Sequence, residues 1–172
     1  MKRKTLTKKL KRVKNSARRK EKMSSTFVFG YGSLMNKESL QSTLPGKKIY
    51  GWAVLRDWRR KFNKPGLDHK YLNLVPADGN VQQTEGVLIE VTPEELAILK
   101  KREGGYKIVD VTKQIVDLPK DAVVVAFIAP AFESLPIRKS YLEKVLASLP
   151  PEKRGQWLAE TDLNNSDIDG NA

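Results

Sequence analysis

The stretch FVFGYGSLMN, residues 27–36, decides how the rest of the chain is interpreted. Its first three residues are apolar and predict a short buried β-strand. Gly30 and Gly32 then flank Tyr31, and glycine allows a positive φ or a close approach of the backbone. Amide groups at the end of such a strand can form a concavity that binds an anion. No Gly-Lys-Ser/Thr follows, so a small carboxylate is a better match than a nucleotide, with a plain tight turn as the alternative.

Around this stretch the sequence predicts many short strands and a few late helices. The predicted strands are 26–29, 48–55, 58–62, 71–75, 84–91, 107–116 and 123–128. The predicted helices are 36–42, 93–103, 134–149 (with Pro136 as the alternative start) and 152–160. The strands do not alternate regularly with helices, which argues against a doubly wound sheet. We therefore expect an α+β fold, with a small mixed β-barrel or a strongly curved sheet and a few inserted helices.

Charge divides the chain into two unequal parts. Residues 1–22 contain twelve Lys/Arg and one acid, a net charge of +11, whereas the remaining residues have a net charge of +1. We expect residues 1–23 to be a basic, disordered tail, residues 24–160 a globular domain, and residues 161–172 a disordered C-terminal end. The tail could bind nucleic acid or another anionic surface. It could also direct mitochondrial import, or be absent if translation starts at Met23.

Composition excludes several classes of site. The chain has no Cys and one His, His69, so disulfides, thiolate nucleophiles and two-His metal sites are excluded. We expect no metal and no cofactor. No apolar run approaches the roughly 18 residues of a membrane span, and no secretory signal is evident. The expected location is the cytoplasm.

One helix carries a candidate functional residue at its end. Thr92-Pro93-Glu94-Glu95 predicts a helix start with a capping box, and Gly104-Gly105 predicts its end. Glu103 lies in the last turn, where a carboxylate opposes the helix dipole. A residue that breaks a local rule is a functional candidate, although a solvated surface Glu is the alternative.

Together these motifs resemble the gamma-glutamylcyclotransferase family. The resemblance rests on FVFGYGSL (27–34) and LKKREGGY (99–106), and it extends over KFN (61–63), YLNLVPADGNVQQTEGVLIEV (71–91) and AFIAPAFESLPIRKSYLEKVLASL (126–149). It covers residues 26–158 and leaves the basic tail outside. Leu34 after Tyr-Gly-Ser is similar to the bacterial-type and plant-type branches. Phe127 stands where some relatives have a Tyr that contacts substrate.

The resemblance implies an enzyme with transferase or lyase chemistry. A γ-glutamyl amine or amide would cyclise to 5-oxoproline and release its amine, without a cofactor. By resemblance, Gly30, Tyr31, Gly32, Ser33 and Leu34 bind the substrate's carboxylate, and Glu103 acts as general base and then acid. The alternative is a catalytically silent module of the same fold, tethered to nucleic acid or an assembly by its tail.

Two further stretches have patterns that predict structural roles. In RDWRRKF (56–62) cations alternate with aromatic residues, which is typical of a strand with one solvated and one buried face. Stacking on nucleic acid is the alternative. Tyr141 and Leu142 are expected to belong to the core.

Overall fold

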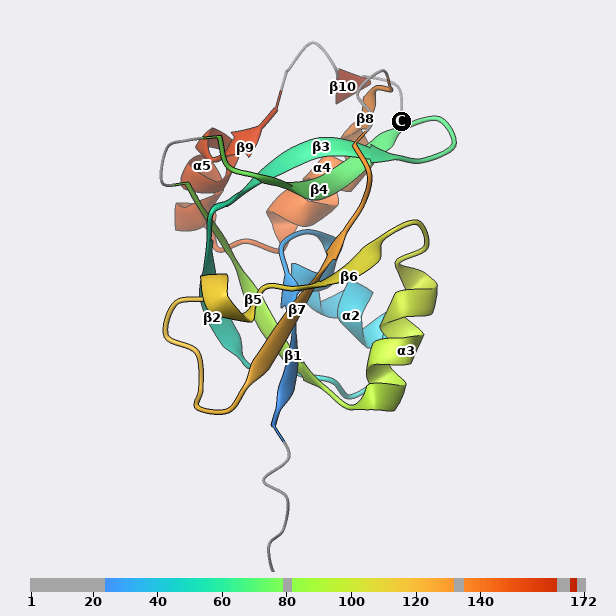
Figure 1. Ribbon diagram of the computed structural model, residues 1–172. Helices are drawn as coiled ribbons and strands as arrows, with labels where there is room; N and C mark the ends of the chain where they lie inside the picture. The colour runs from blue at the N-terminus through green and yellow to red at the C-terminus, as the bar shows by residue number, and fades with distance from the viewer. Residues whose placement is uncertain (1–23, 79–81, 132–134, 164–167, 170–172) are drawn as a thin grey trace, which may run out of the picture.

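The structure is a computed structural model that describes residues 24–78, 82–131, 135–163 and 168–169 (Figure 1). In chain order its elements are β1 (Thr26–Gly30), the 3-10 helix η1 (Ser33–Met35), α2 (Lys37–Thr43), β2 (Gly51–Arg56), β3 (Trp58–Pro65), β4 (Lys70–Pro76), β5 (Gln83–Val91), α3 (Pro93–Arg102), β6 (Lys107–Asp110), the 3-10 helix η2 (Thr112–Gln114), β7 (Val123–Ile128), β8 (Ile137–Arg138), α4 (Lys139–Ala147), α5 (Pro151–Ala159), β9 (Thr161–Asp162) and β10 (Ile168–Asp169). The basic segment 1–23 lies outside the described residues, so its predicted role stays a prediction.

Strand β1 lies at the centre of the first sheet. The strand order is β2-β5-β1-β7-β6, and β1 pairs antiparallel with β5 and parallel with β7. Its residues Phe27, Val28 and Phe29 are all buried, because both faces of this strand are covered. The predicted buried strand is confirmed, and its C-terminal end delivers the glycine-containing loop into the interior (Figure 1).

The second sheet crosses over one end of the first. Its order is β10-β8-β4-β3-β9, with β3 and β4 as an antiparallel hairpin. Asp57, between β2 and β3, has a φ of 65° and turns the chain from one sheet into the other. In Figure 1, β3 and β4 curve over the upper end of the sheet that contains β1. The predicted α+β fold with strongly curved sheets is confirmed.

Helix α3 forms as its start signals predict. The Thr92 hydroxyl accepts from the Glu95 backbone N–H at 3.2 Å, and the Glu95 carboxylate accepts from the Thr92 N–H at 2.9 Å. The helix ends at Arg102, and Gly105 follows with a φ of 84°. Only a residue that tolerates a positive φ suits this turn, so the glycine pair ends the helix next to Glu103.

Two predicted elements are shorter than expected. The predicted strand 107–116 ends at Asp110, whose carboxylate accepts from the Thr112 backbone N–H at 2.9 Å and starts η2. The predicted helix 134–149 begins only at Lys139, because Ile137 is buried and pairs as strand β8 with β4. In the first case a local side-chain-to-backbone hydrogen bond, and in the second a tertiary strand pairing, overrides the apolar pattern.

Part of the C-terminal end is ordered into strands, contrary to the prediction for residues 161–172. β9 pairs parallel with β3, and β10 pairs parallel with β8. Next to this pairing, Arg60 lies on the same face of β3 as the buried Phe62 and has no exposed surface. Its guanidinium donates to the Thr161 hydroxyl at 3.0 Å and to the Glu160 carboxylate at 3.1 Å. It also lies 4.8 Å from the centre of the Trp157 ring.

Candidate active site

The loop after β1 needs its glycines for space. A side chain at Gly30 would place its Cβ 3.2 Å from atoms of Leu34 and Val87. A Cβ at Gly32 would lie 3.2 Å from the Tyr141 hydroxyl oxygen. Neither glycine has a positive φ, and φ of Gly32 is −140°. Of the two expected uses of glycine here, close approach is therefore the one that this loop employs.

Tyr31 is anchored inside the protein. Its hydroxyl donates to the backbone carbonyl of Phe127, and its ring stacks near that of Phe29 with the ring centres 6.4 Å apart. Burial is the main cause that raises the pKa of Tyr31, and the nearby Tyr141 and Glu103 add to it. Tyr31 therefore stays an uncharged donor that ties the loop to the end of β7.

Glu103 caps the C-terminal end of α3 and faces inward. Its backbone N–H donates to the carbonyl of Leu99 at 2.8 Å, while its side chain is 15% exposed. One carboxylate oxygen, Oε1, lies 3.2 Å from Nε of Arg102. Burial raises the pKa of Glu103, and the positive charges of Arg102 and Lys64 oppose that rise. The site thus combines a partly desolvated carboxylate with two cations.

The loop and Glu103 meet in one small cavity at the end of β1. All six site residues that were predicted from the sequence line this cavity, namely Gly30, Tyr31, Gly32, Ser33, Leu34 and Glu103. Its volume is about 30 Å³. Pockets that hold drug-sized ligands usually measure about 300–1,000 Å³, so a substrate must displace side chains at the rim of this cavity.

Five further residues line the cavity, and of these only Phe127 was connected with substrate by the family resemblance. They are Phe29, Leu72, Tyr106, Phe127 and Tyr141. Tyr106 follows the glycine pair after Glu103, and this neighbourhood was the signal that could have found it. Tyr141 was expected in the core, because its place in the apolar pattern of the segment 126–149 gave no signal for a role in the cavity.

The tyrosines give the cavity an uncharged polar wall. Tyr106 donates to the carbonyl of Leu72 at 2.7 Å. Burial is the main cause that raises the pKa of Tyr106 and of Tyr141, and the carboxylate of Glu103 adds to both shifts. These hydroxyls therefore remain protonated near neutral pH, and Glu103 is the group in the cavity that is suited to exchange a proton.

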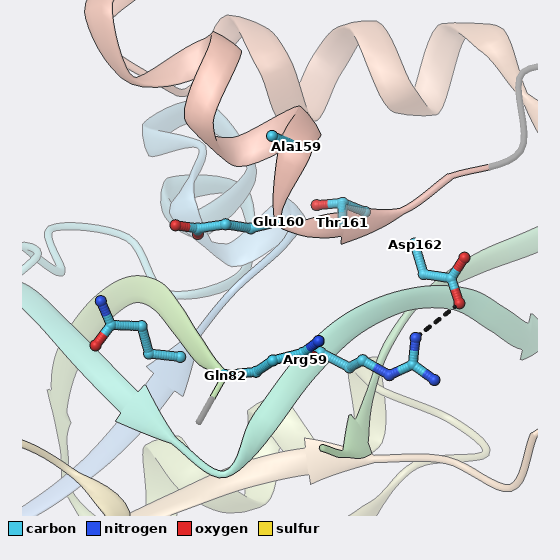
Figure 2. A pocket seen from close by; sticks show the side chains of 7 residues that line it. Arg59, Gln82, Ala159, Glu160, Thr161 and Asp162 are labelled. Atoms are coloured by element: carbon cyan, nitrogen blue, oxygen red, sulfur yellow. Dashed lines mark hydrogen bonds and ion pairs between the residues drawn. The ribbon is translucent and has the colours of Figure 1, made fainter. Parts of the chain in front are cut away.

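A larger hollow lies elsewhere and is less suited to catalysis. It measures about 450 Å³ and lies between Arg59 of β3 and residues 159–162 at the end of α5 (Figure 2). Figure 2 shows the Arg59 guanidinium paired with Asp162, at 3.0 Å. Glu160 is paired with Arg60 at 3.1 Å. Because these charges neutralise one another, we place the candidate site in the smaller cavity.

The described part of the chain shows neither a metal-binding cluster nor a membrane-spanning helix. Within it, no group of three or more His, Asp or Glu side chains is arranged to hold a metal ion. None of the helices described is both long enough and apolar enough to cross a membrane.

Known proteins with similar sequence or structure share this arrangement of elements. Residues 28–148 match the family described as "Gamma-glutamyl cyclotransferase, AIG2-like". A solved structure described as "Gamma-glutamyl cyclotransferase" is 18% identical, with a TM-score of 0.64 over 86% of this chain and 95% of that chain. Uncharacterized protein loc79017 from Homo sapiens is 19% identical, with a TM-score of 0.64 over the same shares.

A third structure, YkqA from Bacillus subtilis, is 22% identical, with a TM-score of 0.56 over 88% of this chain and 57% of that chain. At these identities the solved structures establish the fold. No curated protein sequence matches the chain.

Proposed function

Because the chain belongs to the AIG2-like gamma-glutamyl cyclotransferase family, we propose that it cyclises a γ-glutamyl amine or amide to 5-oxoproline and releases the amine. The observation that carries this proposal is the position of Glu103. Its largely buried carboxylate lines the same small cavity as the Gly30–Leu34 loop, although the two lie some seventy residues apart in the sequence.

In the proposed reaction Glu103 transfers a proton twice. Its carboxylate takes a proton from the substrate's α-ammonium group, and the resulting amine attacks the γ-carbonyl carbon of the same molecule. Glu103 gives this proton to the leaving nitrogen as the C–N bond breaks. The ring nitrogen then gives up its second proton through Glu103 to the released amine, which leaves as an ammonium ion. Atoms balance without water or a second substrate. A raised pKa suits a carboxylate that must act as base and then as acid.

The loop would bind the α-carboxylate and hold the substrate in a curled conformation. Ser33 starts the 3-10 helix η1, and its hydroxyl makes no hydrogen bond as a donor to any described residue. That proton is available to a carboxylate oxygen. Holding the amine near its own carbonyl supplies catalysis by orientation, so no nucleophilic side chain is required.

The test is release of 5-oxoproline from a panel of γ-glutamyl amino acids, γ-glutamyl amines and glutathione. We expect release by the parent, and a loss of at least a hundredfold in Glu103→Gln, since a positioned general base contributes about 10²–10⁴-fold. Glu143→Gln on α4 is the matched control, because Glu143 is exposed and lies outside the cavity. Equal rates in parent and Glu103→Gln would contradict the proposal.

A second candidate function is favoured by the charge of residues 1–22. Their net charge of +11 could neutralise several phosphates. In that case the domain would be a catalytically silent module held on nucleic acid. Two results together would favour this function. No substrate of the panel would release 5-oxoproline, and the protein would show salt-sensitive nucleic-acid binding that is lost when residues 1–22 are removed.

A further inference from the structure

Arg102, the last residue of α3, makes several polar contacts through its guanidinium group. Nη1 donates to the Ser39 carbonyl and to the Thr43 hydroxyl, both at 2.8 Å. Nη2 donates to the Ser39 hydroxyl at 2.8 Å and to the Ser33 hydroxyl at 3.3 Å. Nε faces Oε1 of Glu103 at 3.2 Å. Of the five N–H donors of the guanidinium, the four on Nη1 and Nη2 are thus used in hydrogen bonds, while Nε lies at ion-pair distance from the Glu103 carboxylate.

The five contacts fall into two groups, one to helix α2 and one to the candidate site. Three go to Ser39 and Thr43 of α2 and fix the plane of the guanidinium, and Ser39 is itself buried. The other two reach Ser33 in the substrate-binding loop and Glu103. Arg102 therefore has a polar contact with both halves of the candidate site, the Gly30–Leu34 loop and Glu103.

The contact with Ser33 determines the direction of its hydroxyl. Since the Ser33 oxygen accepts from Arg102, the hydroxyl proton points away from the guanidinium. Ser33 lines the cavity, and no described residue accepts that proton. A hydroxyl held in this way is a donor ready for a carboxylate.

The contact with Glu103 leaves one carboxylate oxygen available. Arg102 engages Oε1, and no hydrogen bond from a described residue reaches Oε2. The other charged or titratable groups that act on Glu103 are Lys64 of β3 and the tyrosines at 31, 106 and 141. The tyrosines stay neutral, so Arg102 and Lys64 supply the positive charge.

We propose that Arg102 is a positioning residue that holds the Ser33 hydroxyl and the Glu103 carboxylate in the geometry required for cyclisation. This inference rests on the proposed function and deepens it. It assigns Arg102 to neither substrate binding nor proton transfer. Its role is to orient the groups that perform them, and this role uses the bidentate geometry of a guanidinium, which an ammonium group cannot reproduce.

The test compares Arg102→Met, Arg102→Lys and the control Lys101→Met, which removes a charge from an exposed neighbour on α3. In Arg102→Met we expect the Glu103 carboxyl, followed by carbon-13 NMR, to titrate at higher pH, and the acid limb of kcat/KM to move with it. We also expect KM to rise about tenfold, as for one lost hydrogen bond of about 1.4 kcal/mol. In Arg102→Lys the acid limb of kcat/KM should stay at the parent's pH, whereas KM should still rise.

Each outcome distinguishes positioning from a purely structural role. If both variants lose thermal stability but keep the parent's Glu103 titration and KM, the proposal is overturned. If Arg102→Met does not fold, Arg102→Lys decides alone, because a parent-like KM would mean that the guanidinium geometry does not matter.

Failure of the proposed function can be told apart from failure of this inference. Were the parent to release no 5-oxoproline, the cyclisation would be rejected. The NMR titration of Glu103 and calorimetric binding of 5-oxoproline would still measure the influence of Arg102. Parent-like values of both in Arg102→Met would then overturn the positioning role.

Discussion

Burial raises the pKa of Glu103, and the charges of Arg102 and Lys64 limit that rise. A general base works as the carboxylate, so kcat/KM falls as the pH drops through this pKa. We expect the acid limb of the profile to lie above the ordinary range of an exposed Glu. Lys64→Met removes one of the two cations and should move the limb to still higher pH. An unchanged limb in Lys64→Met would mean that Lys64 does not act on Glu103.

The same raised pKa has a consequence for stability. In the unfolded chain Glu103 ionises at its ordinary pKa, whereas in the folded protein it ionises only at higher pH. Between these two values the unfolded state binds fewer protons, so the carboxylate lowers stability as pH rises. We therefore expect Glu103→Gln to be at least as stable as the parent at neutral pH. Thermal unfolding checks this, and a clear loss of Tm would contradict it.

Ser33 should contribute to binding more than to proton transfer. Removing its hydroxyl by Ser33→Ala loses one hydrogen bond to a carboxylate, worth about 1.5–3 kcal/mol. We expect KM to rise about 10- to 100-fold with a smaller change in kcat. Ser42→Ala is the control, because Ser42 lies on an exposed part of α2 and bonds to the Ser39 carbonyl. A change confined to kcat would argue against this role.

At this scale the sequence predicted the residues that carry local signals. The loop is recognisable by its two glycines. Glu103 is recognisable by its position at the C-terminal end of a capped helix, where a carboxylate is unfavourable. Both line the cavity. Arg102 and Tyr141 gave no such signal. Their importance arises from contacts with residues up to 69 and 109 positions away, such as Ser33 and Gly32, which only the folded chain brings together.

Among the elements, β5 and β1 must approach closely where the loop begins. A Cβ on Gly86 of β5 would lie 2.5 Å from the Gly30 carbonyl oxygen and 2.5 Å from the Phe29 ring. Gly86→Ala should therefore push β5 away from the end of β1. We expect a loss of about 1–3 kcal/mol in the free energy of unfolding, together with reduced activity.

The matched control for this substitution lies in α5. Gly155 has open space around its Cα, so Gly155→Ala should be neutral or stabilising by about 0.5–1 kcal/mol. Denaturant unfolding of both variants measures the difference. Equal stabilities would show that the strands can relax around the added methyl group.

The elements that the sequence predicted best are those with their own boundary signals. Strand β7 and the capped helix α3 lie within a residue or so of their predicted ranges. The prediction of a helix over 134–149 was wrong in its first part because Ile137 belongs to β8, which lies between β4 and β10 in the second sheet. Such a pairing depends on distant strands and leaves no mark in the local pattern.

For the molecule as a whole, the buried Arg60 joins the C-terminal end to the second sheet. Glu160→Gln removes its charged partner and leaves a cation with no exposed surface. Removing one partner of a buried ion pair costs about 3–5 kcal/mol, so we expect a loss near the lower limit, since Glu160 is partly exposed. The double variant Arg60→Met/Glu160→Gln should recover part of that loss. If it is less stable than the sum of the single variants, this explanation fails.

Binding of a ligand in the cavity also depends on the folding of the entire domain. Its walls come from β1, β4, β7, α4 and the residues after α3, which span both sheets and most of the chain. A small molecule that fills the cavity can therefore recognise only the assembled protein, and its binding free energy adds to the free energy of unfolding. The stabilisation that such a ligand provides would therefore be lost when any of these elements unfolds locally, even where the element lies far from the reacting groups.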